Sequence, residues 1–377
     1  MNRVYFVPGM FGFARLASRE YFEHVQRGLA ERLGADTEFR VAEVLPTESV
    51  RRQAGKIAKL VARTCGKDKG PIHLLGHSTG GLAARLVASP SAQLPAGNEM
   101  LKWLPRLDSV TTINTPHYGT PLATFFATAR GQRMLYAVSA LTFTVLSLGA
   151  PPLAAASALV GLLGRMDKAV GVELRVFDRL TQGVLRVFDE ARSTEVRAYL
   201  DAIKQDQGAI IQVMPEAMDL FIAGVEDRPG VYYQSTASMA PPQSPRRWIS
   251  SLGRPWSAVS SVLFTTLHQL TSRHDARYPC AAPKESAQAA AMFKKSLKKE
   301  PDGRSNDGVV PIRSQVWGNL AWAGYADHLD VLGHFRGDPA DKAEPRHIDW
   351  LTSGSSFDRE QFGQLMDALA GGMTRKA

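Results

Sequence analysis

The amino-acid sequence predicts an α/β fold with a mostly parallel central sheet and helices on both faces. Two observations carry this prediction. Short apolar runs alternate with amphipathic helical segments along residues 1–113, which is the order that strand–helix–strand units produce. A sheet pattern then returns at residues 230–236, after a long helical segment. With 377 residues, of which 44% are hydrophobic and 21% charged, the chain can bury a large core.

The elements of the first part follow in a clear order. Strands are expected at Val4–Val7, Arg40–Leu45, Ile72–Leu75 and Val110–Ile113. Helices are expected at Tyr21–Leu33, Ser49–Thr64 and Leu82–Ala88. Gly34 ends the first of these helices, because glycine readily adopts the conformation of a helix C-terminus. Pro90 ends the third, because the residue before a proline disfavours helical backbone.

The chain changes character after residue 120. Helical periods dominate residues 121–228 and no clear strand appears there, so we expect a helical lid or cap between two parts of the core, 1–120 and 229–377. The second part of the core begins with a strand at Gly230–Thr236 and a loop at 239–256. Helices are expected at Ser257–Leu270, Lys284–Lys299 and Phe357–Leu369.

The insertion contains an uncharged stretch of 31 residues, from Met134 to Gly164. Gly149–Pro152 interrupts it, and each half of about 15 residues spans roughly 22 Å as a helix, whereas a bilayer core is roughly 30 Å thick. An apolar helical hairpin that covers a pocket therefore fits better than a membrane span. Packing against the core is the remaining alternative.

Charge and cysteine content limit the partners and the compartment. The net charge of +9 indicates either a solvated basic surface or attraction to anionic surfaces such as phospholipid. The basic residues are spread out and no nucleic-acid motif appears, so no nucleic-acid partner is expected; the oligomeric state is not indicated. Cys65 and Cys280 are expected to be free thiols. If Met1 is the true start, no signal peptide precedes the first strand and we expect a cytoplasmic protein.

The strongest motif for chemistry is Gly-His-Ser-Thr-Gly at residues 76–80, which matches the pattern G-x-S-x-G. In a nucleophile elbow the serine occupies a strained turn between a strand and a helix, and this turn presents its Oγ above the sheet. An apolar run precedes the motif and a helical pattern follows it, as the elbow requires. Ser78 is therefore the predicted nucleophile, and the alternative is an ordinary serine turn.

An oxyanion hole is expected beside this serine. One donor is the backbone N–H of the residue after the nucleophile, Thr79. The second comes from the Gly-rich loop after the first strand, Pro-Gly-Met-Phe-Gly-Phe at 8–13, where Met10 is the predicted donor. Phe11 lies in this loop, His77 lies in the elbow motif, and His117 follows the strand at 110–113. We expect these three residues to shape the substrate pocket.

The acid and the base must follow the serine, because α/β-hydrolases place their triad in the order serine, acid, histidine. Asp307 occupies a turn, Asn-Asp-Gly at 306–308, where a carboxylate at a strand end can orient an imidazole. His328 follows 21 residues later and is the predicted base. Alternatives stay open for both roles. They are His334 and His347 for the base, and Asp327 and Asp330 for the orienting acid.

Together these segments resemble the true lipases of bacterial family I, the Pseudomonas and Burkholderia type. The matching segments are 8–13, 76–81, Thr-Pro-His-Tyr-Gly-Thr at 115–120, Gly-Val-Tyr-Tyr at 230–233, Asn-Asp-Gly-Val-Val at 306–310 and Asp-His-Leu-Asp at 327–330. The resemblance implies Ser78, Asp307 and His328 as the triad, Met10 and Thr79 as oxyanion donors, and a mobile helical lid after residue 120. This sequence departs from the family pattern at Pro8, where the family usually has histidine.

The resemblance also implies a structural Ca²⁺ near the catalytic histidine. Asp330 matches one ligand by position, but the next ligand, a glutamine in the family, falls on His334. Calcium prefers oxygen ligands, so an imidazole argues against it. Asp330 and His334 alone make a weak case for a transition metal. We therefore expect no metal and no cofactor, with structural calcium as the alternative.

The activity expected from these features is cleavage of carboxylic esters with hydrophobic, long-chain acyl groups, through an acyl-enzyme, as in a triacylglycerol lipase. Polyesters of the polyhydroxyalkanoate type and phospholipids are alternative substrates. A hydrolase-fold protein that binds a membrane surface without catalysis is an alternative of a different class. Even for a lipase, transient contact between the lid and a lipid interface is expected.

Overall fold

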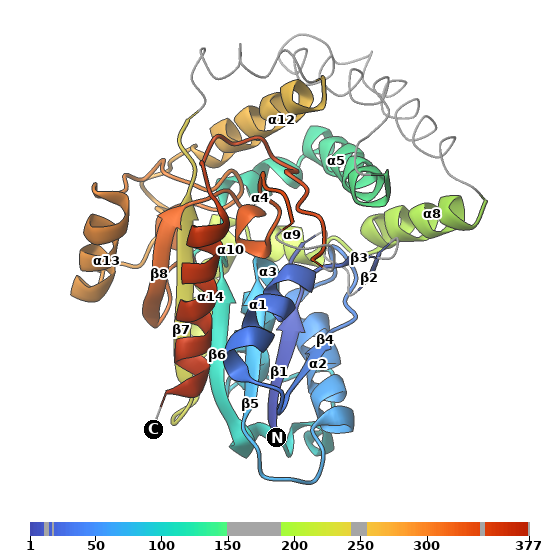
Figure 1. Cartoon of the computed structure of the whole chain (residues 1–377), viewed down its shortest axis with the longest axis vertical. Helices are drawn as coiled ribbons and strands as arrows, with labels where there is room; N and C mark the ends of the chain where they lie inside the picture. Colours follow the sequence, from blue (N-terminus) through green and yellow to red (C-terminus); the bar gives the residue numbers. More distant parts are fainter. Residues whose placement is uncertain (11–14, 17–18, 149–189, 243–254, 340–343, 376–377) are drawn as a thin grey trace.

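The computed structural model describes residues 1–10, 15–16, 19–148, 190–242, 255–339 and 344–375. At its centre is a six-stranded sheet of order β4-β1-β5-β6-β7-β8, in which every pair of neighbours is parallel (Figure 1). Its strands are β1 Asn2–Val7, β4 Thr37–Val41, β5 Ile72–His77, β6 Leu107–Ile113, β7 Tyr232–Met239 and β8 Asn319–Tyr325. A separate antiparallel pair is formed by β2 Arg15–Leu16 and β3 Arg19–Glu20. The predicted fold class is confirmed.

Helices cover both faces of the sheet, and the alternation of side chains along β1 shows how. Val4 and Phe6 belong to the core on the face covered by α1 (Glu23–Leu33) and α14 (Arg359–Thr374). Tyr5 and Val7 point to the other face, where α2 (Val50–Thr64) and α3 (Thr79–Ala88) close a second core. Since successive side chains of a strand point to opposite faces, one apolar run fills both cores.

Further helices gather where the strands end. The described ones are α4 Pro121–Phe126, α5 Ala129–Leu148, α8 Glu190–Gln205, α9 Gly208–Gln212, α10 Pro215–Gly224 and α12 Pro255–Thr271, with α13 Ala287–Leu297 beside β8. Figure 1 shows α5, α8 and α12 above the carboxyl ends of the strands. Within the described residues of 121–228, the predicted helical character agrees with α4, α5, α8, α9 and α10. The prediction for 149–189 lies outside the described residues, and the role of these helices as a lid stays a prediction.

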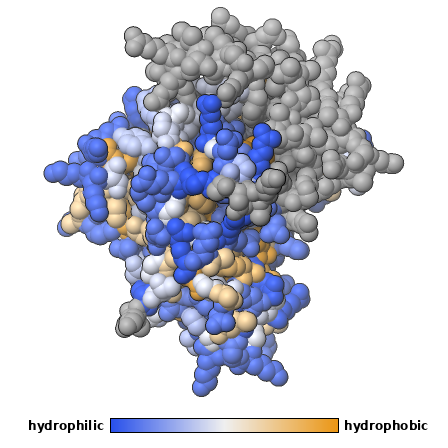
Figure 2. Space-filling view, viewed as in Figure 1, coloured by the Kyte–Doolittle hydropathy of each residue, from blue (hydrophilic) through white to orange (hydrophobic). Residues whose placement is uncertain are grey.

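The uncharged stretch is described only in part. Its first half lies in α5, and the half after Leu148 falls outside the described residues. Among the helices that the structure describes, none is long and apolar enough to cross a membrane. Figure 2 shows a visible surface that is mainly hydrophilic, with apolar patches between the hydrophilic residues. Cys65 and Cys280 are buried and free, as predicted.

Three details differ from the sequence analysis. The second strand lies at Thr37–Val41 rather than 40–45, because it pairs with β1 from Asn2↔Thr37 to Phe6↔Val41 and the chain leaves the sheet after that. Strand β8 is not predicted, because its sequence Asn-Leu-Ala-Trp-Ala-Gly-Tyr contains small residues and none that is β-branched. No strand adjoins Asp307. The turn is closed by an isolated bridge between Asn306 and Pro311, and a short 3₁₀ helix, Ile312–Gln315, follows it.

Two adjacent glycines of α14 give a prediction about packing. A Cβ on Gly371 would meet nothing within 4 Å, whereas a Cβ on Gly372 would collide with the side-chain amide of Gln234, which donates hydrogen bonds to Thr111 Oγ1 (2.9 Å) and the Leu369 carbonyl (3.1 Å). Gly371→Ala should raise the free energy of unfolding by ~0.5–1 kcal/mol through helix propensity. Gly372→Ala should lower it by ~1–3 kcal/mol through overpacking. Urea unfolding of both variants checks this, and equal effects would contradict it.

Candidate active site

Ser78 lies on a strained turn between β5 and α3. Its backbone has φ 53° and ψ −130°, a positive φ that is uncommon for a residue with a side chain. The turn is held by tertiary contacts, since Ser78 N–H donates to the carbonyl of Ile113 at the end of β6 (2.9 Å). Strain of this kind persists only where the surroundings fix it. The predicted strand–turn–helix geometry of the elbow is therefore present.

The glycines around Ser78 are required by close packing. A Cβ on Gly76 would collide with the backbone of Gly80 and Gly81, and a Cβ on Gly80 would collide with the carbonyl of Val7. A Cβ on Gly9 would lie 2.5 Å from the Cβ of Ser78. The loop after β1 and the elbow after β5 thus touch through bare backbone, which brings the predicted oxyanion loop beside the serine.

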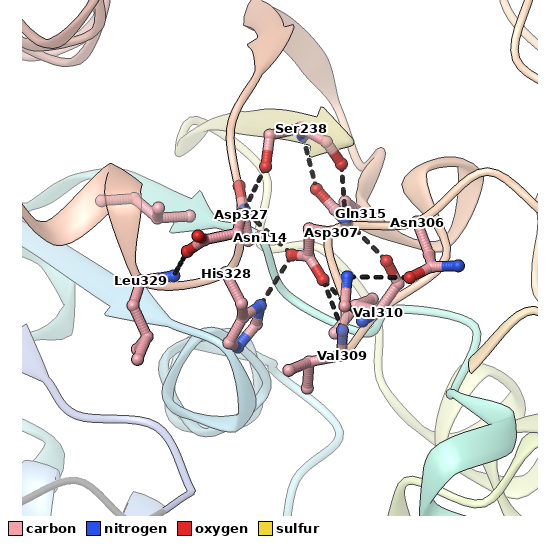
Figure 3. Close-up of polar contacts among 12 residues, drawn as sticks. Asn114, Ser238, Asn306, Asp307, Val309, Val310, Gln315, Asp327, His328 and Leu329 are labelled. Atoms are coloured by element: carbon pink, nitrogen blue, oxygen red, sulfur yellow. Dashed lines mark hydrogen bonds and ion pairs between the residues drawn. The ribbon is translucent and has the colours of Figure 1, made fainter. Parts of the chain in front are cut away.

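Asp307 and His328 form a direct pair (Figure 3). His328 Nδ1 lies 2.7 Å from Asp307 Oδ2, and His328 backbone N–H donates to the Asp307 carbonyl (3.0 Å). Asp307 is fully buried and His328 is 5% exposed. Asp307 Oδ1 accepts hydrogen bonds from the backbone N–H groups of Val309 (2.9 Å) and Val310 (2.7 Å). The carboxylate is therefore fixed in place, and it leaves Nε2 of His328 as the nitrogen that can take a proton from a serine.

Asn114, which the sequence analysis does not single out, supports the carboxylate. Its side-chain amide donates to Asp307 Oδ2 (3.0 Å) and to Ser238 Oγ (2.7 Å). Its backbone φ is 47°, a left-handed conformation that asparagine tolerates better than most residues. Gln315 completes the frame, because it accepts from Ser238 N–H (2.7 Å) and donates to the Val310 carbonyl (2.9 Å) (Figure 3). In the sequence, the feature that could have indicated Asn114 is its position directly after the apolar strand at 110–113.

The same geometry decides between the residues left open for acid and base. Asp327 accepts from the backbone N–H groups of Leu329 (2.9 Å) and Asp330 (3.0 Å) and so shapes the loop that carries His328. Asp330 accepts from Asp327 N–H (2.8 Å) and Ser355 hydroxyl (2.7 Å). Neither carboxylate is bonded to the ring of His328, which contacts Asp307 instead.

The two other candidate bases lie in different surroundings. His347 Nδ1 donates to the Gly333 carbonyl (2.7 Å), and its Nε2 faces Glu344 and Arg359. His334 lines the same cavity as His328, but the imidazole that contacts Asp307 is that of His328. His328 is therefore the histidine that the structure pairs with the buried acid.

An apolar cavity opens onto Ser78 and His328. The described residues that line it also include Met10, Tyr21, Thr79, Pro116, Thr120, Leu122, Ala123, Phe126, Val138, Val213, Leu267, Val309, Val310, Leu329, His334, Trp350 and Leu351. Both predicted oxyanion residues, Met10 and Thr79, thus border the same space as the serine. Their role as donors stays a prediction. Phe11, predicted to contact substrate, lies outside the described residues.

His77 and His117 require a correction, because neither is among the described residues that line this cavity. His117 is buried with Nε2 3.0 Å from Thr112 Oγ1 and Nδ1 3.1 Å from Arg85 Nη1. His77 is buried against the backbone of His328 (3.0 Å). Burial lowers the pKa of both imidazoles well below the usual value. Both side chains are buried beside the site, His77 as the last residue of β5 and His117 four residues after β6.

The predicted metal candidates, Asp330 and His334, do not form a ligand group. The carboxylate of Asp330 accepts hydrogen bonds from Asp327 N–H in its own loop and from the Ser355 hydroxyl, and calcium would need more oxygen donors than this pair provides. Among the described residues, one group of three could offer ligands, namely His24, Glu344 and His347. Arg359 already pairs with Glu344 (2.6 Å), and the rings of His24 and His347 stack at 4.4 Å. Two stacked rings cannot both direct in-plane lone pairs at one ion, so this arrangement does not fit a metal.

Buried and half-buried carboxyl groups lie around the loop of His328. Burial raises the pKa of Asp327 to about 6, and burial beside Asp327 raises the pKa of Asp349 to about 7. The pKa of Asp330 is also well above its usual value, because this carboxyl is buried next to Asp327. A raised pKa means that the folded protein keeps a proton that the unfolded chain loses, so these acids make stability depend on pH.

Asp349 gives a prediction with a defined sign. Its folded pKa is about 7 against an ordinary value of 3.8, so the free energy of unfolding should fall as pH rises through this window. Asp349→Asn cannot ionise and should escape this loss. Its advantage over the wild type should be near zero at pH 4 and reach ~1–2 kcal/mol at pH 8, discounted for partial exposure.

Urea unfolding across this pH range measures the difference. The matched control is Asp36→Asn at an exposed position, which makes the same replacement away from the buried carboxyl groups. A constant difference for Asp349→Asn would contradict the prediction.

The arrangement defines a class of chemistry. A serine on a strained elbow, an imidazole held by a buried carboxylate, and backbone amides beside them are the parts that nucleophilic acyl transfer requires. The fold that carries them is the α/β-hydrolase fold, with the nucleophile at the carboxyl end of a central parallel strand.

Comparisons with known proteins agree with this class. The chain is 31% identical over 118 residues to a triacylglycerol lipase of Pseudomonas fragi, covering 31% of this chain and 35% of that protein. It is 35% identical over 121 residues to a triacylglycerol lipase of Vibrio cholerae, covering 31% of this chain and 33% of that protein. The match thus spans about a third of the length of these relatives. No protein-family model matches the chain.

A solved structure supports the fold over nearly the whole chain. EstA from Clostridium botulinum superposes with a TM-score of 0.52 at 16% identity, covering 96% of this chain and 87% of that one. At this identity the likeness concerns the fold. The predicted resemblance to bacterial lipases is therefore supported by sequence over about a third of the chain, and the predicted fold is supported by EstA. The subgroup of Pseudomonas and Burkholderia type stays a prediction.

Proposed function

We propose that this protein is a serine hydrolase that cleaves carboxylic esters of hydrophobic acyl groups, as a triacylglycerol lipase or carboxylesterase does. The observation that carries the proposal is that Ser78 and His328 lie at the wall of one apolar cavity, with His328 held from behind by the buried Asp307. The partial similarity to two proteins named triacylglycerol lipase supports the same reaction.

The reaction follows from the geometry in two steps. His328 Nε2 accepts the hydroxyl proton of Ser78 while Oγ attacks the ester carbonyl, and Asp307 stabilises the imidazolium through Nδ1. Backbone N–H groups of Met10 and Thr79 would stabilise the oxyanion, and one such donor typically lowers the barrier by roughly 3 kcal/mol. The imidazolium then protonates the leaving alcohol. Water, activated by the same imidazole, releases the acid and restores Ser78.

The cavity favours an apolar acyl chain. Its described lining contains aliphatic and aromatic side chains such as Leu122, Phe126, Val138 and Leu267, and no lysine or arginine. A phospholipase would gain from a cation near the phosphate, so the described lining favours neutral esters over phospholipids. Polyesters remain a second candidate that the lining permits. The complete Ser-His-Asp set argues against a binder without catalysis.

Two further expectations belong to the proposal. The helices within 121–228 would contact a lipid interface transiently while an acyl chain enters the cavity. The groups that carry the chemistry are the side chains of the triad and two backbone amides. The reaction as proposed therefore needs no cofactor. A cytoplasmic location is proposed with it.

A chain-length series of p-nitrophenyl esters tests the reaction. Wild-type protein should hydrolyse esters of eight or more carbons faster than acetate, because a longer chain buries more apolar surface in the cavity. Ser78→Ala should lower kcat by 10³-fold or more on every ester, in line with the loss of a triad nucleophile. Turnover that persists in Ser78→Ala would sink the serine mechanism. Activity confined to acetate would sink the long-chain preference alone.

Filling the cavity should separate acyl binding from chemistry. Leu267 is 4% exposed and lines the cavity from α12. Leu267→Trp should cut kcat/KM for a twelve-carbon ester by about tenfold or more and leave acetate within about threefold, since the added ring displaces the acyl chain. The ratio of the two rates is the readout, and acetate is the internal control for folding. An unchanged ratio would show that the chain binds elsewhere.

A further inference from the structure

A chain of buried hydrogen bonds connects three loops of the active site. Tyr21, just before α1, places its hydroxyl 2.8 Å from His77 Nδ1. His77 Nε2 lies 3.0 Å from the backbone carbonyl of His328. The backbone N–H of Gly9 adjoins the Tyr21 hydroxyl and acts to lower its pKa, against the larger effect of burial, which raises it. His77 is fully buried and Tyr21 is 8% exposed, so these bonds do not compete with bulk water.

The direction of every bond in this chain follows from one fixed acceptor. The His328 carbonyl can only accept, so His77 must carry its proton on Nε2. Burial keeps the pKa of His77 well below its usual value, so the ring is neutral and Nδ1 has a free lone pair. The Tyr21 hydroxyl therefore donates to Nδ1, which leaves its own lone pairs to face the Gly9 N–H. Both hydrogen bonds of the chain run in one direction, from Tyr21 to His77 and from His77 to the His328 carbonyl.

We propose that Tyr21 and His77 form a positioning relay that sets the oxyanion loop and the base loop relative to Ser78. The inference rests on the proposed ester hydrolysis. The relay runs from Tyr21, which adjoins Gly9 in the loop of the predicted donor Met10, to the backbone of His328, through the residue that directly precedes the nucleophile. Neither side chain is assigned a chemical step. Each acts through the backbone groups that it holds.

Two features explain why these loops need a fixed spacing. Gly9 approaches Ser78 closely enough that an added Cβ would lie 3.3 Å from Ser78 Oγ, so a small shift of this loop changes the space for an oxyanion. The rings of His77 and His328 lie 4.6 Å apart, centroid to centroid. A neutral His77 contributes a fixed Nε2–H donor there, whereas a cationic ring would oppose the imidazolium that forms on His328.

A double-mutant cycle tests the relay. Tyr21→Phe removes the hydroxyl and keeps the ring, and His77→Gln keeps an N–H that can reach the His328 carbonyl but not the acceptor for Tyr21. Each single variant should lower kcat on p-nitrophenyl butyrate about tenfold and leave KM within about twofold. The double variant should lose about the same tenfold, because residues that act as one unit are not additive.

Tyr5→Phe is the matched control. Tyr5 is a buried tyrosine of β1 whose hydroxyl lies 3.0 Å from Thr64 Oγ1, on the other face of the sheet. It should keep kcat within about twofold, with a change in thermal stability similar to that of Tyr21→Phe. A Tyr21→Phe variant as active as Tyr5→Phe would overturn the relay. A loss of about 100-fold in the double variant, or an effect of Tyr21→Phe on KM alone, would also overturn it, in favour of independent roles or direct substrate contact.

A spectroscopic readout separates the relay from the proposed function. Nitrogen-15 NMR of histidine-labelled protein should show His77 as the neutral Nε2–H tautomer from pH 5 to 9, in wild type and in Ser78→Ala alike. A Nδ1–H tautomer, or titration of His77 within this range, would refute the relay even if ester hydrolysis is found. Absence of ester hydrolysis with the expected tautomer would refute the proposed function and leave the hydrogen-bond geometry standing.

Discussion

The strained turn at Ser78 is the constraint on which the rest of the site depends. A positive φ at a residue with a side chain is unfavourable, and here it is imposed by close backbone packing between β1, β5 and β6. The glycines at 76 and 80 allow that packing because a Cβ at either position would collide with neighbouring backbone. The sheet therefore holds the serine hydroxyl at its carboxyl edge, and the other functional groups are placed relative to that edge.

The second half of the site is assembled from the opposite end of the chain. Asp307 and His328 lie on loops before and after β8, and β8 enters the sheet through parallel pairing with β7. Asn114 connects this half to the first, since it follows β6 and donates to the carboxylate of Asp307. These polar groups are buried, and each contact that Asp307 makes with Asn114 and His328 is a hydrogen bond. Together these bonds select one orientation of the His328 imidazole.

The site also shows how burial separates roles among similar residues. Aspartates at 307, 327 and 330 are all buried within one region, yet one orients the imidazole and the other two shape the loop that carries it. His77 and His328 adjoin each other with different tasks, because one ring is enclosed between Tyr21 and a carbonyl and the other borders the cavity. Local environment, more than residue type, decides what each group can do.

The sequence by itself determined the fold class, most of the strands and helices, and Ser78 with its glycines, because these depend on short-range patterns of apolar residues and on backbone sterics within a few positions. Strand β8, with its small residues, lacked such a pattern. Only the tertiary structure decided that Asp307 rather than Asp327 or Asp330 meets His328, that Asn114 supports the pair, and that His77 turns inward to Tyr21. These choices rest on contacts between residues far apart in the chain, such as 193 positions between Asn114 and Asp307 and 251 between His77 and His328. A linear pattern carries no information on which of several neighbouring carboxylates or imidazoles the folded sheet brings within hydrogen-bond distance.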